Sequence, residues 1–145
     1  APERKLYQDL KKNTKGIIWN RIENLSLLGM PDVLGYNTSG VFFTIELKVA
    51  KGNKVKFSPH QIAFHKSHPK KTFILVRTLG PCSLKLVPGS EIHDLWSKGH
   101  DSCFTVADSW TTVQETFNNI FSLLLGAWCL ALVACGLQLG AWSLD

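Results

Sequence analysis

GVFFTIELKVA, residues 40–50, is rich in β-branched and aromatic side chains, as is typical of a central β-strand. Successive side chains of a strand point to opposite faces, so Phe43, Ile45 and Leu47 share one apolar face. Glu46 and Lys48 project together from the other face. Two interpretations stay open for this charged pair: an ordinary ion pair on an exposed edge, or polar groups that the fold holds among core residues.

Helix and strand signals on both sides of residues 41–50 predict an α/β fold. Ser58 is a natural N-cap, Pro59 suits the first helical position and Gln61 completes a capping box. That helix is expected to run to about residue 67, since Pro69 follows. The order α-β-β-β-α-β predicts a small mixed sheet flanked by helices. The other expected elements are a basic amphipathic helix over 3–14, strands over 17–24, 32–37, 72–78 and 83–87, and a short helix over 89–99 capped by Ser90.

Charge is divided unevenly along the 145 residues, whose net charge is +5. Residues 1–77 hold 14 Lys and Arg against 5 Asp and Glu, a net charge of +9, whereas residues 78–145 hold 2 against 6, a net charge of −4. A basic half predicts a polyanionic partner, most commonly nucleic acid. The alternative is a lysine-rich surface that serves only solubility.

The cysteine pattern and the N-terminal segment favour a reduced, cytoplasmic protein. The cysteines are sparse and form no CxxC pair, so neither a disulfide scaffold nor a zinc site is expected. Residues 1–16 are polar and lack the apolar stretch of a secretory signal. His65 and His68 share a helix face, yet surface or capping roles are favoured over a metal site.

The C-terminal third contains an apolar run, because residues 120–142 carry no charged side chain in 23 positions. That length could span a bilayer, but three glycines, Gln138 and the lack of flanking Lys or Arg argue against a membrane helix. We expect instead a helix over 109–125 that packs against the sheet or a second subunit. The chain is therefore divided into a core over 1–100 and an apolar packing or dimerisation extension over 101–145.

Asp32 follows Pro31 at the start of the strand expected over 32–37, where its carboxylate can approach that of Glu46. Two neighbouring carboxylates repel each other unless a divalent cation holds both. Mg²⁺ takes oxygen ligands of this kind and keeps several waters. The alternative role for Asp32 alone is that of an ordinary turn residue.

The pair PD at 31–32, followed by ELK at 46–48, resembles the motif of the PD-(D/E)XK nuclease superfamily. The pattern over 17–78 is similar to virus-type VRR-NUC domains and Holliday-junction-resolvase-like endonucleases. The resemblance implies a restriction-endonuclease-like core in which Asp32, Glu46 and the Leu47 carbonyl bind Mg²⁺ or Mn²⁺. It also implies that Lys48 orients or deprotonates water and offsets charge, that Gln61 supports the site, and that an additional acid comes from Glu3 or Glu23.

The implied activity is metal-dependent hydrolysis of DNA phosphodiester bonds, including those of branched or junction structures, by a protein of phage or viral origin acting in the host cytoplasm. The apolar C-terminal segment predicts a homodimer, because an exposed apolar patch of that size would otherwise aggregate. Exposed lysines along one edge are expected to contact DNA phosphates: Lys51, Lys54, Lys56, Lys66, Lys70 and Lys71. Two alternatives stay open: a DNA-binding protein with a vestigial nuclease site, and a membrane-associated protein that uses residues 120–142.

Overall fold

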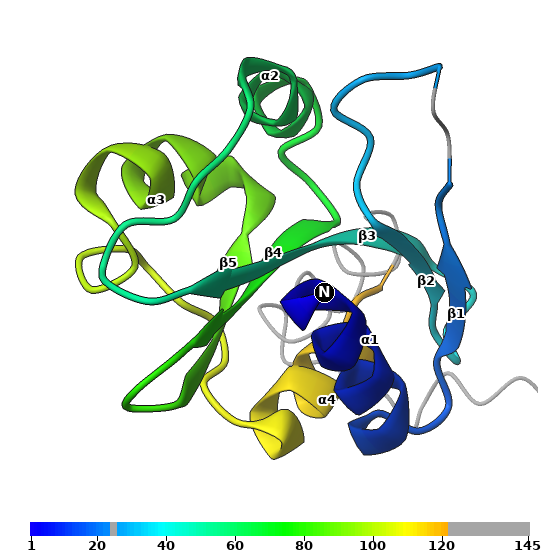
Figure 1. The fold of residues 1–145 in the computed structure, drawn as a ribbon. Coiled ribbons are helices and arrows are strands. Elements are labelled where there is room, and N and C mark those ends of the chain that lie inside the picture. The colour runs from blue at the N-terminus through cyan, green and yellow to red at the C-terminus, as the bar shows by residue number, and fades with distance from the viewer. Residues whose placement is uncertain (24–25, 122–145) are drawn as a thin grey trace, which may run out of the picture.

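A single mixed β-sheet organises the chain, and its five strands lie in the order β1-β2-β3-β4-β5 (Figure 1). The computed structural model describes residues 1–23 and 26–121. Strands β1, β2 and β3 form an antiparallel meander, β4 runs parallel to β3, and β5 returns antiparallel to β4. Their bounds are β1 Ile18–Arg21, β2 Val33–Tyr36, β3 Phe42–Ala50, β4 Thr72–Thr78 and β5 Ser83–Pro88.

One face of the sheet is covered by helices α1 (Pro2–Asn13) and α4 (Trp110–Asn118). Leu6 and Leu10 of α1 lie one helical turn apart, so both reach the sheet, and both are fully buried. They pack in one apolar cluster with Phe43, Ile45 and Leu47 of β3 and with Val113 and Phe117 of α4. The described part of the predicted extension over 101–145 thus contributes to the core.

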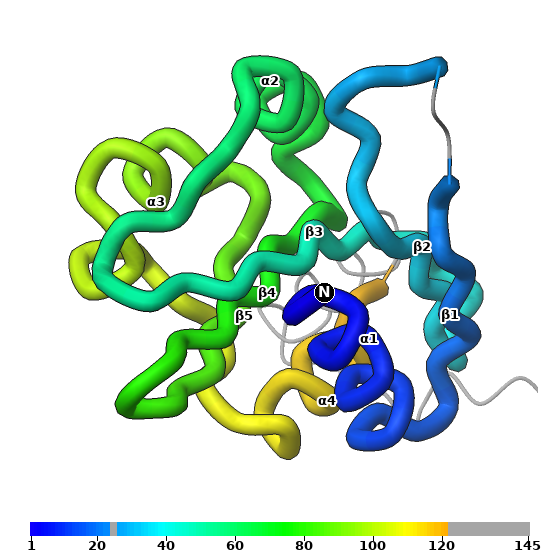
Figure 2. Tube along the Cα trace, in the orientation of Figure 1, coloured from blue at the N-terminus to red at the C-terminus, as the bar shows by residue number. Residues whose placement is uncertain are grey.

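The opposite face carries helices α2 (Pro59–Ser67) and α3 (Ile92–Lys98), with the short 3-10 helix η1 (Gly89–Glu91) leading into α3. Here Ile74 and Val76 of β4 pack against Ile92 and Leu95 of α3. Helix α2 is the crossover between the parallel strands β3 and β4, and Figure 2 shows that it lies beside the segment leading to β2. The sheet is therefore the middle layer between two pairs of helices (Figure 1).

The predicted α/β fold, a small mixed sheet flanked by helices, is confirmed. Two local predictions were wrong. Ser90 does not cap α3, because η1 occupies residues 89–91 and places Glu91 at the N-cap without a side-chain bond. Helix α4 ends at Asn118 rather than near 125, since the backbone N–H of Asn119 already closes the last turn.

Most of the apolar run over 120–142 lies outside the described residues, and so do the predictions made for it. Within residues 1–23 and 26–121, no helix combines the length and the apolar character needed to cross a membrane.

Candidate active site

Strand β3 places Glu46 and Lys48 on the α2 side of the sheet, opposite the face that packs on α1. Glu46 lies beside Ile74 and Lys48 beside Val76 of the parallel strand β4, so both are in the middle of the sheet. The Glu46 side chain is 2% exposed and that of Lys48 is 18% exposed. The interpretation of an ion pair on an exposed edge is therefore wrong.

Asp32 directly precedes β2 and contacts β3 along the edge that pairs with β2, opposite the edge that pairs with β4. The pairing of Val33 with Ile45 is the last step of the β2–β3 ladder, and Asp32 continues beyond it. The backbone N–H of Leu47 donates to Asp32 Oδ2 at 2.8 Å. The carboxylate is thus fixed against β3, and its side chain has a long-range partner that a simple turn residue does not need.

Gln61 connects Glu46 to Lys48 from the first turn of α2. Ser58 and Gln61 form the predicted capping box, in which Gln61 Oε1 accepts the backbone N–H of Ser58 at 3.0 Å. Gln61 Nε2 also donates to Glu46 Oε1 at 2.8 Å, and Lys48 Nζ donates to Gln61 Oε1 at 3.1 Å. The cap therefore orients an amide that bridges Glu46 and Lys48.

A close backbone approach holds the Asp32 segment against α2. Gly29 has a φ of +84°, and a Cβ atom built there would lie 2.4 Å from the carbonyl oxygen of His60. Glycine is the residue that tolerates both this conformation and this contact. The loop before Asp32 and the helix that carries Gln61 are consequently positioned against each other.

Electrostatics at Glu46 favour a cation. Burial, followed by the neighbouring Asp32 carboxylate, raises the pKa of Glu46 from 4.5 to about 8, although the Lys48 ammonium acts in the opposite direction. Glu46 Oε2 is buried and has no hydrogen-bond partner among the described residues. A buried carboxylate oxygen without a donor, beside a second carboxylate, is a chemically suitable pair of ligands for a hard divalent ion.

The backbone supplies a further oxygen on the same edge. In an antiparallel ladder, a residue's N–H and C=O groups point toward the same neighbouring strand. Since the Leu47 N–H faces Asp32, the Leu47 carbonyl faces that side too, one step beyond the last β2–β3 pair. The residues present therefore fit an ion held by two carboxylates, one carbonyl and water.

The two candidates for an additional acid are not brought to this place. Glu23 is 80% exposed and pairs with Arg21 at 3.9 Å. Glu3 belongs to α1, which packs on the opposite face of the sheet. In the described part of the chain, no third Asp, Glu, His or Cys joins Asp32 and Glu46 in a metal-binding cluster.

The predicted DNA-binding lysines lie at both ends of β3 rather than along one edge. Lys71 precedes β4, and its carbonyl accepts the N–H of Thr44 near the start of β3, whereas Lys51 follows the end of β3 at Ala50. The parallel pairing of β3 with β4 produces this separation. All six lysines are exposed, and they bracket Glu46 and Lys48: Lys51, Lys54, Lys56, Lys66, Lys70 and Lys71.

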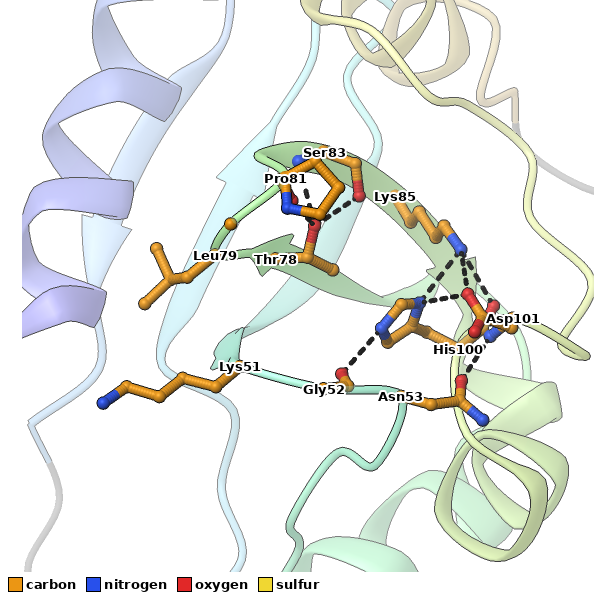
Figure 3. A pocket seen from close by; sticks show the side chains of 11 residues that line it. Lys51, Gly52, Asn53, Thr78, Leu79, Pro81, Ser83, Lys85, His100 and Asp101 are labelled. Atoms are coloured by element: carbon orange, nitrogen blue, oxygen red, sulfur yellow. Dashed lines mark hydrogen bonds and ion pairs between the residues drawn. The ribbon is translucent and has the colours of Figure 1, made fainter.

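Sequence reasoning missed the contacts that anchor the segment after β3 (Figure 3). His100 Nε2 donates to the Gly52 carbonyl at 2.8 Å, and the N–H of Asp101 donates to Asn53 Oδ1 at 2.8 Å. Lys85 Nζ and Asp101 Oδ1 lie 2.9 and 3.2 Å from His100 Nδ1, while the Gly52 carbonyl can accept only from a protonated Nε2. Gly52 and His100 are 48 residues apart in sequence, as are Asn53 and Asp101, and no local pattern links them.

His65 also differs from its predicted surface or capping role. It is fully buried, and its Nδ1–H donates to the Gln61 carbonyl at 2.9 Å. Burial lowers its pKa below the ordinary value of 6.5. A neutral His65 therefore packs α2 onto the sheet, one turn after Gln61.

Comparisons with known proteins found similarity to solved structures only. No protein-family model matches the sequence, and no curated protein matches it. Among solved structures, the chain is similar to Hjc, a Holliday junction resolvase from the archaeal hyperthermophile Archaeoglobus fulgidus, with 18% identity and a TM-score of 0.42. The match covers 61% of this chain and 74% of that one.

Proposed function

We propose that the protein is a metal-dependent nuclease that hydrolyses phosphodiester bonds of DNA. The observation that supports this most directly is the buried Glu46 carboxylate, which has an unpaired oxygen, lies beside Asp32 and has Lys48 Nζ 3.9 Å from its other oxygen. This acid, acid and lysine arrangement agrees with the resemblance to the PD-(D/E)XK superfamily and its restriction-endonuclease-like core.

Asp32, Glu46 and the Leu47 carbonyl are the groups that would hold Mg²⁺ or Mn²⁺. Such an ion polarises a phosphoryl oxygen and acidifies water. Lys48 supplies a fixed positive charge beside the position where negative charge develops in the transition state. That charge is more effective in a mostly buried site than in water. Gln61 keeps Glu46 and Lys48 in place, so its role is positioning.

The lysines at both ends of β3 support a DNA substrate that crosses the site. They would contact phosphates without reading bases. Branched or junction DNA as the substrate, a homodimer as the active form and a phage or viral origin are finer proposals that follow from the superfamily resemblance.

The decisive experiment compares the wild type with Glu46→Gln on linear, nicked and branched DNA in Mg²⁺, Mn²⁺ and chelator. We expect Glu46→Gln to abolish cleavage while DNA binding in chelator is retained or strengthened, because the substitution removes a metal ligand and leaves every exposed lysine in place. Thermal stabilisation of the wild type by Mg²⁺ should also disappear in this variant. Glu23→Gln is the matched control and should cleave like the wild type. Cleavage by Glu46→Gln at the wild-type rate would overturn the proposal.

A second candidate function, DNA binding by a vestigial site, is favoured only by the exposed lysines. It predicts salt-sensitive DNA binding with no cleavage under any metal condition. The same assay distinguishes it, because the wild type itself would then be inactive.

A further inference from the structure

An open groove of about 640 Å³ lies between α3 and the segment that joins β3 to α2. It has a mixed lining of basic, aromatic and small side chains: Lys54, Val55, Lys56, Phe57, Trp96 and Ser97. Its lining contains none of the metal-binding or bridging residues of the candidate active site.

The lysine side of the groove follows from an alternating pattern of burial over residues 54–57. Val55 is 4% exposed, and both Val55 and Phe57 pack in the apolar cluster on the α3 side of the sheet, so these two side chains point inward. Lys54 and Lys56 alternate with them and are exposed. Because a fully extended chain spans about 3.3 to 3.6 Å per residue, the two lysine positions are at most roughly 7 Å apart. That spacing suits successive phosphates of an extended polynucleotide strand.

The aromatic side of the groove is Trp96 of α3. Its side chain is 46% exposed, although tryptophan side chains are on average highly buried. Helix α3 does not need Trp96 for packing, because Ile92 and Leu95 already hold it against the core. A single exposed apolar residue needs no explanation by itself. Here, however, the ring borders the same groove as two lysines, which is the combination used by single-strand-binding surfaces.

The groove lies next to the candidate active site. The Phe57 ring, which lines the groove, has Lys48 Nζ 4.8 Å from its centroid. One aromatic ring therefore separates the groove from the lysine proposed to act on the scissile phosphate.

The two walls of the groove are fixed to each other. Asn53 Nδ2 donates to the Lys98 carbonyl, at the end of α3, at 3.0 Å, and the His100 N–H donates to the Asn53 carbonyl at 2.9 Å. Figure 3 shows Asn53 also linked to Asp101. A ligand would thus meet a preformed groove and would not have to order it.

We propose that this groove binds an unpaired DNA nucleotide next to the scissile phosphodiester, with its base stacked on Trp96 and neighbouring phosphates on Lys54 and Lys56. This inference rests on the proposed nuclease function and specifies its substrate: DNA with unpaired nucleotides at the cleavage position. A base inside a duplex has both faces occupied by its neighbours and is not free to stack on Trp96.

The test measures binding in chelator of a 12-residue oligothymidine and of a blunt duplex of equal length, with Glu46→Gln as the parent. We expect Trp96→Ala to weaken oligothymidine binding about tenfold and duplex binding less than about twofold. Trp96→Phe keeps a stacking ring and should retain most of the affinity. Phe42→Ala, which removes a 58% exposed ring at the far end of β3, is the matched control. Thermal melting confirms that each variant is folded.

The lysines give an independent readout. Replacing both Lys54 and Lys56 by Ala should reduce the slope of log affinity against log salt for oligothymidine by about 1.4, since two phosphate contacts are lost. Trp96→Ala should leave that slope nearly unchanged because the lost contact is uncharged. Equal slopes in the wild-type and double-lysine proteins would overturn the groove assignment.

The outcomes separate this inference from the function on which it rests. If the wild type cleaves DNA but Trp96→Ala binds oligothymidine normally, the groove assignment fails and the nuclease proposal stands. If oligothymidine binding depends on Trp96 but no DNA is cleaved with either metal, the nuclease proposal fails and the groove stands as a single-strand-binding site.

Discussion

The two faces of β3 differ in whether their buried side chains have unpaired polar atoms. On the α1 side, Phe43, Ile45 and Leu47 pack into one apolar cluster. On the α2 side, the same strand buries Glu46, one of whose carboxylate oxygens has no hydrogen-bond partner among the described residues. The apolar face accounts for stability. The polar face costs stability in the metal-free protein, as expected if it holds the metal ion proposed above.

After Glu46→Gln, the largest effect is expected from Lys48→Met. The variant keeps the aliphatic stem but removes the charge near Glu46, so the cleavage rate should fall between about 100- and 1,000-fold. Single-turnover kinetics with saturating DNA measure this. A loss smaller than about tenfold would contradict a direct role for the ammonium group.

On the apolar face, Ile45→Ala is expected to reduce the free energy of unfolding by about 3 kcal/mol, because it leaves a cavity in a fully buried position. Urea unfolding measures the loss. The activity of the fraction that remains folded should change little, in contrast to Lys48→Met. If fully folded Ile45→Ala lost as much activity as Lys48→Met, the two faces of β3 would not differ in function.

Gly29→Ala should affect both structure and site. The substitution forces a side chain into a positive φ and against the His60 backbone, at a cost on the order of 2 kcal/mol. Because Gly29 sets the distance between the Asp32 segment and α2, Mg²⁺ should also stabilise the variant less than the wild type. Gly52→Ala is the control, since its Cβ would meet nothing within 4 Å. Equal thermal stabilities of the two variants would refute the close-approach argument.

The smallest effect is the change in the free energy of unfolding for each pH unit. The folded chain raises the pKa of Glu46 from 4.5 to about 8, so between these values the folded state binds more protons than the unfolded state. Stability in chelator should therefore fall as pH rises through this window, by at most about 1.4 kcal/mol per pH unit from this group. Glu46→Gln lacks this contribution and should show a flatter profile. Identical profiles would mean that Glu46 is not held in an unfavourable environment.

Local patterns predicted much of this architecture. The bounds of α2 and β4 follow from a capping box, a terminating proline and a β-branched run, and the structure has both as expected. The prediction that Ser90 caps α3 was wrong because residues 89–91 form a 3-10 turn instead. The arrangement of the lysines was wrong because their placement depends on the parallel pairing of β3 with β4, which no short segment encodes.

The sequence by itself determined which side chains share a face of β3 and which residue caps α2, because both depend on contacts within a few residues. Only the tertiary structure decided that Asp32 accepts the Leu47 N–H and that Gln61 bridges Glu46 and Lys48. It also placed Trp96 and Lys56 on one groove. These contacts depend on strand register and on the α2 crossover, which bring together residues that are distant along the chain.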